Sequence, residues 1–289
     1  MRFTVRVPAT SANLGPGFDS FGLALCLYNE VTVDTDSAPS VTWEGEGAEE
    51  LPVDGSDLIS TSMTRAAAAS GVALPAVALQ GRNGIPLERG LGSSAAAAVA
   101  GVMLASAVLE LDIHDDPNSV LALATEIEGH PDNAAPAILG GLTVAYAAGV
   151  PPIRLEPHEQ LHPVVLVPEG VRLPTEAARR ALPQQVAFSD AVFNLAHATA
   201  TAIALTSDPE LLSTSLRDRL HQDVRLDLVP EVRAVFDGLV DSGVPVCVSG
   251  AGPALIAFAS ADVVVADPGA GWKRLDLLPD LHGAQLSPG

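Results

Sequence analysis

The chain has 289 residues, 48% of them hydrophobic, so it is long enough to bury the core of one large domain or two ordinary ones. Its formal net charge of −20 leaves no basic face for a phosphate backbone, so we expect no nucleic-acid partner. The most apolar stretch, residues 95–111, is interrupted by Ser106 and Glu110 and is shorter than the roughly 20 strongly apolar residues of a membrane span, so we expect no membrane partner.

The N-terminal residues 3–7 alternate as a strand does and lack the apolar stretch of a signal peptide, which predicts a cytoplasmic protein. A Gly/Pro/Asn-rich loop is expected over 8–19, followed by strand-like apolar sequence up to residue 34. Two cysteines, Cys26 and Cys247, lie far apart in apolar sequence. Their spacing argues against a zinc site, and we expect buried free thiols in a reducing compartment.

A helix is expected over 58–70 with Ser56 or Asp57 as its cap, followed by a strand over 76–80. That strand leads to a glycine turn that opens directly into an alanine-rich helix. Such a turn frees several backbone N–H groups and lets an anion approach them, which predicts a phosphate site; the alternative is a tightly packed turn without a ligand. The candidate phosphate-binding residues are Pro86, Leu87, Glu88, Arg89, Gly90, Leu91, Gly92, Ser93, Ser94, Ala95 and Ala96.

This candidate phosphate site lacks the lysine of a Walker-type loop, because Lys273, near the C-terminus, is the only lysine in the chain. The negative charge of the phosphates must then be stabilised by the helix N-terminus, by hydroxyls such as Ser93 and Ser94, and by a metal ion that carboxylates elsewhere hold.

A further helix is expected to begin at Asp116-Pro117 and to end at Glu128, with Gly129 as its C-cap. Glu126 and Glu128 lie in its last turn, where the helix dipole disfavours negative charge. A nearby cation would reverse that penalty, whereas ordinary solvation of a surface turn would tolerate both side chains. Both interpretations stay open from this segment alone.

The prolines at 151 and 152 and the polar stretch after them mark the best domain boundary, which predicts an N-terminal domain over 1–155 and a C-terminal domain over 156–289. Helical and strand patterns alternate in the second part, so both domains are expected to be α+β. The expected helices are 175–181, 189–205 and 230–242, and the expected strands are 162–167, 246–248 and 255–259.

Four separated motifs, read together, carry a family resemblance. They are Pro-Ala-Thr-Ser-Ala-Asn-Leu-Gly-Pro-Gly-Phe-Asp at 8–19, Gly-Leu-Gly-Ser-Ser at 90–94, Glu-Gly-His-Pro-Asp-Asn-Ala-Ala-Pro at 128–136 and Ser-Gly-Ala-Gly-Pro at 249–253. Their order and spacing resemble the GHMP small-molecule kinases, and the first and third motifs look like the homoserine kinase branch of that family.

The resemblance implies a two-domain α+β fold, with an N-terminal ATP-binding domain followed by a ferredoxin-like domain. It also implies ATP and Mg²⁺ as cofactors, and phosphorylation of the side-chain hydroxyl of L-homoserine to O-phospho-L-homoserine for threonine biosynthesis. A homodimer is compatible with the sequence, which does not determine the oligomeric state.

The resemblance implies that Asn13 and Asp19 face the amino-acid substrate, with the aspartate opposite its ammonium; on this loop alone they read as an Asx-turn pair. Asp132 and Asn133 match the pair beside the reacting hydroxyl, where Asp132 acts as a general base or, as we favour, positions the substrate. His130 orients the substrate or serves as a structural cap.

The substrate carboxylate needs an arginine fork, and Arg179 and Arg225 match the family's two arginine positions. Arg180 and Arg219 are close rivals by sequence alone. For the metal ion, Glu128 with a hydroxyl such as Ser93 is the implied pair, and Glu126 is the alternative.

Two features depart from the family pattern. Ala254 stands where many relatives have a hydroxyl residue, which puts one hydrogen bond near the substrate in doubt. Ser56-Asp57-Leu58 matches the adenine pocket only loosely, so no base contact is assigned. Two rival functions remain: a GHMP kinase for another alcohol such as mevalonate, which would need no ammonium partner, and a non-catalytic ATP-binding regulator, which would have lost the metal and transfer residues.

Overall fold

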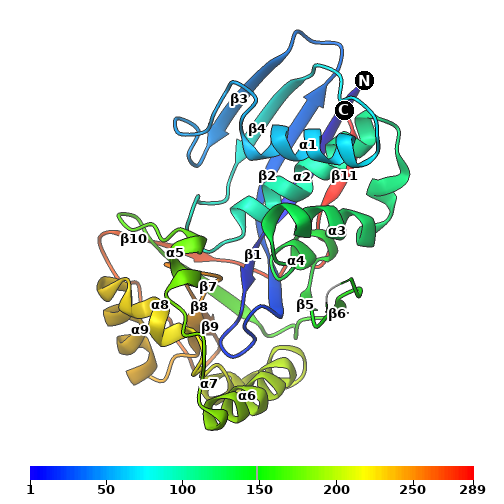
Figure 1. Cartoon of the computed structure of the whole chain (residues 1–289). Helices are drawn as coiled ribbons and strands as arrows, with labels where there is room; N and C mark the ends of the chain where they lie inside the picture. Colours follow the sequence, from blue (N-terminus) through cyan, green and yellow to red (C-terminus); the bar gives the residue numbers. More distant parts are fainter. Residues whose placement is uncertain (148) are drawn as a thin grey trace.

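The computed structural model describes residues 1–147 and 149–289, whose strands form two sheets with helices packed around them (Figure 1). The strands are β1 (Arg2–Ala12), β2 (Phe21–Asp34), β3 (Ser40–Gly45), β4 (Ala78–Asn83), β5 (Leu142–Val144), β6 (Ile153–Leu155), β7 (His162–Pro168), β8 (Val246–Val248), β9 (Leu255–Ala259), β10 (Trp272–Asp276) and β11 (Gln285–Pro288). The helices of the first domain are α1 (Leu58–Ala69), α2 (Ser93–Val108), α3 (Pro117–Glu128) and α4 (Ala134–Leu139), with a 3₁₀ turn at Asp112–Asp115. The second domain carries α5 (Thr175–Arg180), α6 (Phe188–Thr206), α7 (Leu212–Ser215), α8 (Gln222–Asp227) and α9 (Pro230–Asp241), with a 3₁₀ turn at Pro209–Leu211.

The first sheet has the order β11-β1-β2-β4-β3, and β5 and β6 extend it from β2. Helix α2 packs against both α1 and β1 and is buried over most of its length. Small residues allow this close packing, since a Cβ at Gly101 would lie only 2.6 Å from the carbonyl oxygen of Ile59 in α1. Burial on nearly all sides explains why this helix is alanine-rich rather than amphipathic.

The second sheet has the antiparallel order β10-β7-β9-β8, the order of a ferredoxin-like sheet. Helices α5 to α9 all fall in the connection between β7 and β8. The connection between β9 and β10, residues 260–271, is described throughout and forms no helix. The predicted α+β fold with a ferredoxin-like second domain is therefore confirmed, with its second crossover reduced to a loop.

Capping residues set several helix ends as the sequence predicts. Asp57, rather than Ser56, caps α1 by accepting a hydrogen bond of 2.9 Å from the backbone N–H of Ser60. Asp116 caps α3, and Gly129 ends that helix in the left-handed conformation that favours glycine.

Some expectations were wrong. Residues 8–12 of the expected loop continue strand β1, because they pair with β2 after a register shift between Pro8 and Ala9. Cys26 is only half-buried, although both it and Cys247 are free thiols as expected. Strand β11 returns to pair with β1, so the last strand lies in the first sheet and not in the second domain proposed from the sequence. Among the described residues, no helix has both the length and the apolar character needed to cross a bilayer.

Candidate active site

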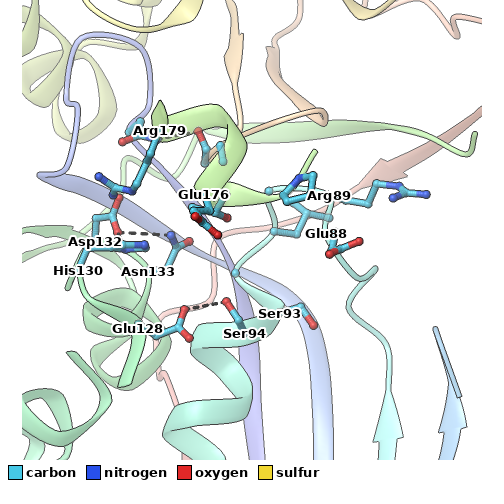
Figure 2. A pocket seen from close by; sticks show the side chains of 18 of the residues that line it. Glu88, Arg89, Ser93, Ser94, Glu128, His130, Asp132, Asn133, Glu176 and Arg179 are labelled. Carbon is cyan, nitrogen blue, oxygen red and sulfur yellow. Dashed lines mark hydrogen bonds and ion pairs between the residues drawn. The ribbon is translucent and has the colours of Figure 1, made fainter. Parts of the chain in front are cut away.

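A cavity of about 530 Å³ lies where the glycine turn before α2 and the end of α3 meet the second domain (Figure 2). Most predicted site residues line it, although they come from five separate parts of the chain. Its lining is Asn13, Glu88, Arg89, Gly90, Leu91, Gly92, Ser93, Ser94, Ile127, Glu128, His130, Asp132, Asn133, Pro174, Thr175, Glu176, Arg179, Arg225, Gly250 and Ala251.

Four residues of the candidate phosphate-binding segment are not in the lining of this cavity. Ala95 and Ala96 are fully buried inside α2. Pro86 and Leu87 instead line a smaller hollow beside Arg89. The contact surface offered to a ligand is therefore the turn over 88–94, shorter than the segment picked from the sequence.

The turn itself presents backbone to the cavity. Gly92 adopts φ +68° immediately before α2, and no side chain caps the helix start. A Cβ at Gly92 would overlap the hydroxyl of Thr10, and one at Gly90 would overlap the carbonyl oxygen of Ser249. The glycines are thus required by close packing against protein as well as by backbone conformation, and not only by the approach of a ligand.

Arg89 makes a different contact from the one expected for an anion-binding residue. Its side chain is buried and donates to the carbonyl oxygens of Pro168 at 3.0 Å and Glu169 at 2.9 Å. Burial lowers the pKa of this guanidinium. Figure 2 shows the side chain directed away from the other labelled residues, so Arg89 joins the glycine turn to the end of β7.

Glu128 is the acidic residue of α3 that faces the cavity, whereas Glu126 is exposed. Its carboxylate accepts a hydrogen bond of 2.7 Å from Ser94, and burial raises its pKa (Figure 2). Ser93 points away from Glu128 in the same view, so Ser94 rather than Ser93 is the neighbouring hydroxyl. Within the described residues, no group of three or more His, Cys, Asp and Glu side chains forms a metal cage.

A short hydrogen-bonded chain follows the end of α3. His130 Nδ1 lies 2.6 Å from Asp132 Oδ1, and this bond raises the pKa of the imidazole. Asn133 Nδ2 lies 3.5 Å from the same carboxylate oxygen, and its own Oδ1 accepts from the hydroxyl of Thr10 at 2.8 Å. Thr10, part of the first motif but not singled out by the sequence argument, therefore orients the Asn133 amide toward Asp132.

Both polar atoms of the Asn13 side-chain amide form hydrogen bonds to the backbone of the protein. Its Nδ2 donates to the carbonyl oxygen of Gly250 at 2.7 Å, and its Oδ1 accepts from the backbone N–H of Asp19 at 3.0 Å. This bond spans six residues instead of the two of an Asx turn, so Asn13 closes a wider loop, in which Asn13 adopts φ +70° and Asp19 φ +53°. Asn13 still lines the cavity and sets the position of Asp19.

Arg179 and Asp19 form a bidentate ion pair, with N–O distances of 2.6 and 3.0 Å. This bond raises the pKa of Arg179. The two rivals suggested by the sequence are exposed and pair elsewhere: Arg180 with Glu176, and Arg219 with Asp190.

Arg225 is buried, and its Nη1 donates to the carbonyl oxygen of Gly250 at 2.7 Å. Burial lowers the pKa of this guanidinium to about 10. Both Arg179 and Arg225 keep a buried Nε that has no hydrogen-bond partner among the described residues. A buried donor without a partner is costly, so this pair of arginines is suited to an anionic ligand.

A second hollow of about 310 Å³ adjoins the cavity and shares Glu88, Ser93 and Ser94 with it. Trp43, Leu51 and Leu87 give it apolar walls. Asp57 also lines it, and the Oδ2 atom of this buried carboxylate has no hydrogen-bond partner in the described part of the chain.

Ala254, the departure noted in the sequence, is fully buried, and it is absent from the residues that line the cavity. Its backbone N–H donates to the carbonyl oxygen of Arg89 at 3.1 Å. The position therefore supports the glycine turn through its backbone.

Comparison with known proteins agrees with this geometry. The family model for the GHMP kinases N terminal domain matches residues 58–141, and the model for the GHMP kinases C terminal matches residues 199–267. The chain belongs to the GHMP kinase family. The homoserine kinase of Streptomyces avermitilis is 45% identical over 291 residues, covering 98% of this chain and 95% of that protein. The homoserine kinase of Clavibacter michiganensis is 42% identical over 297 residues, covering 99% and 94%.

Solved structures give the same family assignment for this GHMP kinase. The crystal structure of homoserine kinase from Cytophaga hutchinsonii has a TM-score of 0.83 at 25% identity, covering 99% of this chain and 97% of that one. The phosphomevalonate kinase of Streptococcus pneumoniae, at 15% identity and a TM-score of 0.67, shares the fold. The family and fold predicted from the four motifs are confirmed.

Proposed function

We propose that this GHMP kinase is a homoserine kinase, which transfers the terminal phosphoryl group of ATP to the side-chain hydroxyl of L-homoserine. One observation carries the proposal: the cavity extends from the uncapped N-terminus of α2 to Arg179, which forms an ion pair with Asp19. Asp19 itself lines another hollow rather than this cavity. The helix N-terminus suits a polyphosphate, and the ion pair offers one cation and one anion to a zwitterionic amino acid. Relatives 42–45% identical over nearly the whole chain are homoserine kinases, which supports this substrate.

The nucleotide would lie along the glycine turn. The first N–H groups of α2 have no intrahelical partners, and the helix dipole adds partial positive charge at that end. The adjoining hollow would take the base between Trp43 and Leu87, with the free Oδ2 of Asp57 as an acceptor for an amino group. Ser93 and Ser94 line both the cavity and the adjoining hollow. If the phosphate chain passes these two residues, the base would lie in the hollow and the transferring phosphoryl group in the cavity, on opposite sides of the turn.

Glu128 and Ser94 fit a magnesium ion. A carboxylate and a hydroxyl are the oxygen donors this ion prefers, and it commonly takes only one or two protein ligands beside phosphate oxygens and water. The raised pKa of Glu128 reflects a burial cost that a bound cation would offset. When bound, magnesium would neutralise charge on the phosphates, a role for which the cavity lining offers no lysine. Lys273, the one lysine in the sequence, lines the hollow beside Arg89 and pairs with Glu46.

The amino acid would bind at the other end of the cavity. Arg179 and Arg225 would face its carboxylate through donors that the protein leaves unused, and Asp19 would accept its ammonium. Because Asp19 and Arg179 already hold each other at 2.6 Å, the two charges stand side by side before the substrate arrives. Mevalonate carries a carboxylate but no ammonium, so it would offer no charged donor to Asp19 beyond the Arg179 that the protein already supplies.

Asp132 would position the reacting hydroxyl rather than remove its proton. Its Oδ1 is already engaged by His130, whose raised pKa favours the protonated, ion-paired form. A carboxylate held by a cation is a weak base, and phosphoryl transfer through a loose transition state needs little base assistance. Asn133 would align the same hydroxyl from the neighbouring position.

The proposal is tested by measuring ADP release with ATP and magnesium against L-homoserine, mevalonate, galactose and L-threonine. L-Homoserine should be the preferred acceptor, and its product should show a phosphate monoester on the side-chain oxygen by phosphorus NMR. A faster rate with mevalonate or galactose would show that the proposed substrate is wrong. If none of the four acceptors stimulated ADP release, a regulatory protein would be favoured. The free cysteines fit a reducing cytoplasm as the place of this reaction.

A further inference from the structure

The start of helix α8 brings a buried histidine against one of the two substrate arginines. His221 is 1% exposed, and its Nδ1 lies 3.2 Å from Nη1 of Arg225, one helical turn further along. Its Nε2 lies 2.7 Å from the carbonyl oxygen of Gly15, in the loop that carries Asp19. This imidazole therefore links the two parts of the chain that would hold the carboxylate and the ammonium of the substrate.

We infer that His221 is a positioning residue for amino-acid binding, which holds the guanidinium of Arg225 in the orientation that leaves its Nε available. The inference rests on the proposed function of Arg225 as a carboxylate ligand. His221 is outside the lining of the cavity, so it acts through Arg225 and not by touching the substrate.

The chemistry of the two neighbours determines the protonation state of the ring. A guanidinium has only donors, so Nδ1 of His221 must accept from Arg225, and a carbonyl only accepts, so Nε2 must donate to Gly15. Both bonds are satisfied together only by the neutral imidazole with its proton on Nε2. Burial lowers the pKa of His221 to about 4, which keeps the ring in that neutral form.

The surroundings hold the imidazole itself in place. The backbone N–H of His221 donates to Asp218 Oδ2 at 2.8 Å, which anchors the start of α8. The ring of Phe18 lies 5.1 Å from the imidazole, and the same ring lies 5.3 Å from the Arg225 guanidinium. Arg225 also has the Gly250 carbonyl as a second anchor, so loss of the histidine contact would loosen the guanidinium rather than release it.

Two amide variants test the two hydrogen bonds of the His221 imidazole one at a time. His221→Asn keeps an acceptor near the Nδ1 position, facing Arg225, whereas His221→Gln keeps a donor near the Nε2 position, facing Gly15. We expect His221→Gln to raise the KM for L-homoserine about tenfold, the effect of losing one hydrogen bond to a charged group, with the KM for ATP nearly unchanged. His221→Asn should recover most of that loss. If His221 contributed only to general stability, both variants would change by similar amounts, and the KM for L-homoserine and the KM for ATP would be affected alike.

The decisive experiment is a double-mutant cycle of His221→Gln with Arg225→Ala. If the histidine acts through Arg225, His221→Gln adds no further rise in homoserine KM once Arg225 is alanine. Additive effects, or an equal rise in the KM for ATP, would overturn the inference and leave the proposed function standing. If Arg225→Ala alone leaves homoserine KM unchanged, the carboxylate assignment itself fails, and this inference fails with it.

His197→Leu is a matched control, because His197 lies on α6 and does not line the cavity. Its homoserine KM should stay within about twofold of the parent. Thermal melting of each variant checks that the folded fraction is the same in all assays.

Discussion

The two ends of the cavity are built in different ways. The phosphate end, the turn over 88–94 with the start of α2, is one continuous stretch of chain whose polar groups are mainly backbone N–H and hydroxyls. The proposed amino-acid end is lined by Arg179 and Arg225, and Asp19 reaches it through its ion pair with Arg179. These charged residues are separated by up to about two hundred positions in the sequence. In the proposed function, the first end binds the nucleotide, whereas the second selects the acceptor.

Because the two ends differ in this way, nucleotide binding and acceptor binding can be perturbed independently. A change in the turn should act on nucleotide and fold together, because the glycines pack against Thr10 and Ser249. A change at the amino-acid end should act on the acceptor while nucleotide binding persists. The predictions below test that separation, beginning with the largest effect.

Gly92→Val should abolish activity and also lower stability. Valine would adopt a left-handed conformation at φ +68° and overlap Thr10, which together cost at least about 2 kcal/mol. Gly71→Val is the matched control, since Gly71 has a similar φ of +70° but open space where a Cβ would lie. The difference in their urea midpoints measures the contact with Thr10, and equal midpoints would show that the turn tolerates a side chain.

Glu128→Gln should reduce ADP release on the order of 100-fold at a fixed low magnesium concentration, because the neutral amide binds the ion poorly. Glu126→Gln, two residues away and exposed, should change the rate less than about twofold. Magnesium titrations of both variants provide the measurement. The opposite ranking would move the metal ligand to Glu126.

Arg179→Ala and Arg225→Ala should each lower kcat/KM for L-homoserine ten- to a hundredfold, since a hydrogen bond to a charged group contributes about 1.5–3 kcal/mol. Their KM for ATP should stay close to the parent. Arg180 and Arg219 are exposed, so Arg180→Ala and Arg219→Ala should have little effect on kcat/KM for L-homoserine or on the KM for ATP. Losses in these controls as large as those at Arg179 and Arg225 would refute the assignment of the fork.

His130→Gln should give the smallest effect, a pH-dependent loss of stability. The Asp132 hydrogen bond raises the pKa of His130, so the stabilisation is fully present below the ordinary histidine pKa of about 6.5 and is lost as pH rises through the raised pKa. The difference in Tm between parent and variant should be largest near pH 5.5 and shrink toward pH 9. Asp132→Asn should remove this trend, and a difference that grows with pH would contradict the ion pair.

The helix ends of the first part of the chain were largely predictable from the sequence, because a helix end depends on local residues. Asp57, Asp116 and Gly129 set helix ends where their chemistry predicts, and the glycine turn opens α2 as expected. The contact of Ser94 rather than Ser93 with Glu128 was not predictable, since it depends on how α2 and α3 face each other.

The residues proposed for the amino-acid end could be chosen only through the family resemblance. Arg179 and Arg180 are neighbours in one short helix, and nothing local distinguishes the one that pairs with Asp19 from the exposed one. The position of His221 could not be predicted locally, because one of its partners, Gly15, is about two hundred residues away in the sequence. Sheet pairing of β11 with β1 was missed for the same reason, being a contact between the two ends of the chain.

The central claim, that the amino-acid end recognises a zwitterion, is tested most directly by comparing L-homoserine with 4-hydroxybutyrate, which lacks only the ammonium group. The parent enzyme should prefer L-homoserine strongly in kcat/KM, and Asp19→Asn should lose most of that preference with the KM for ATP unchanged. A preference that survives in Asp19→Asn, or a parent that phosphorylates both acceptors equally well, would contradict the account.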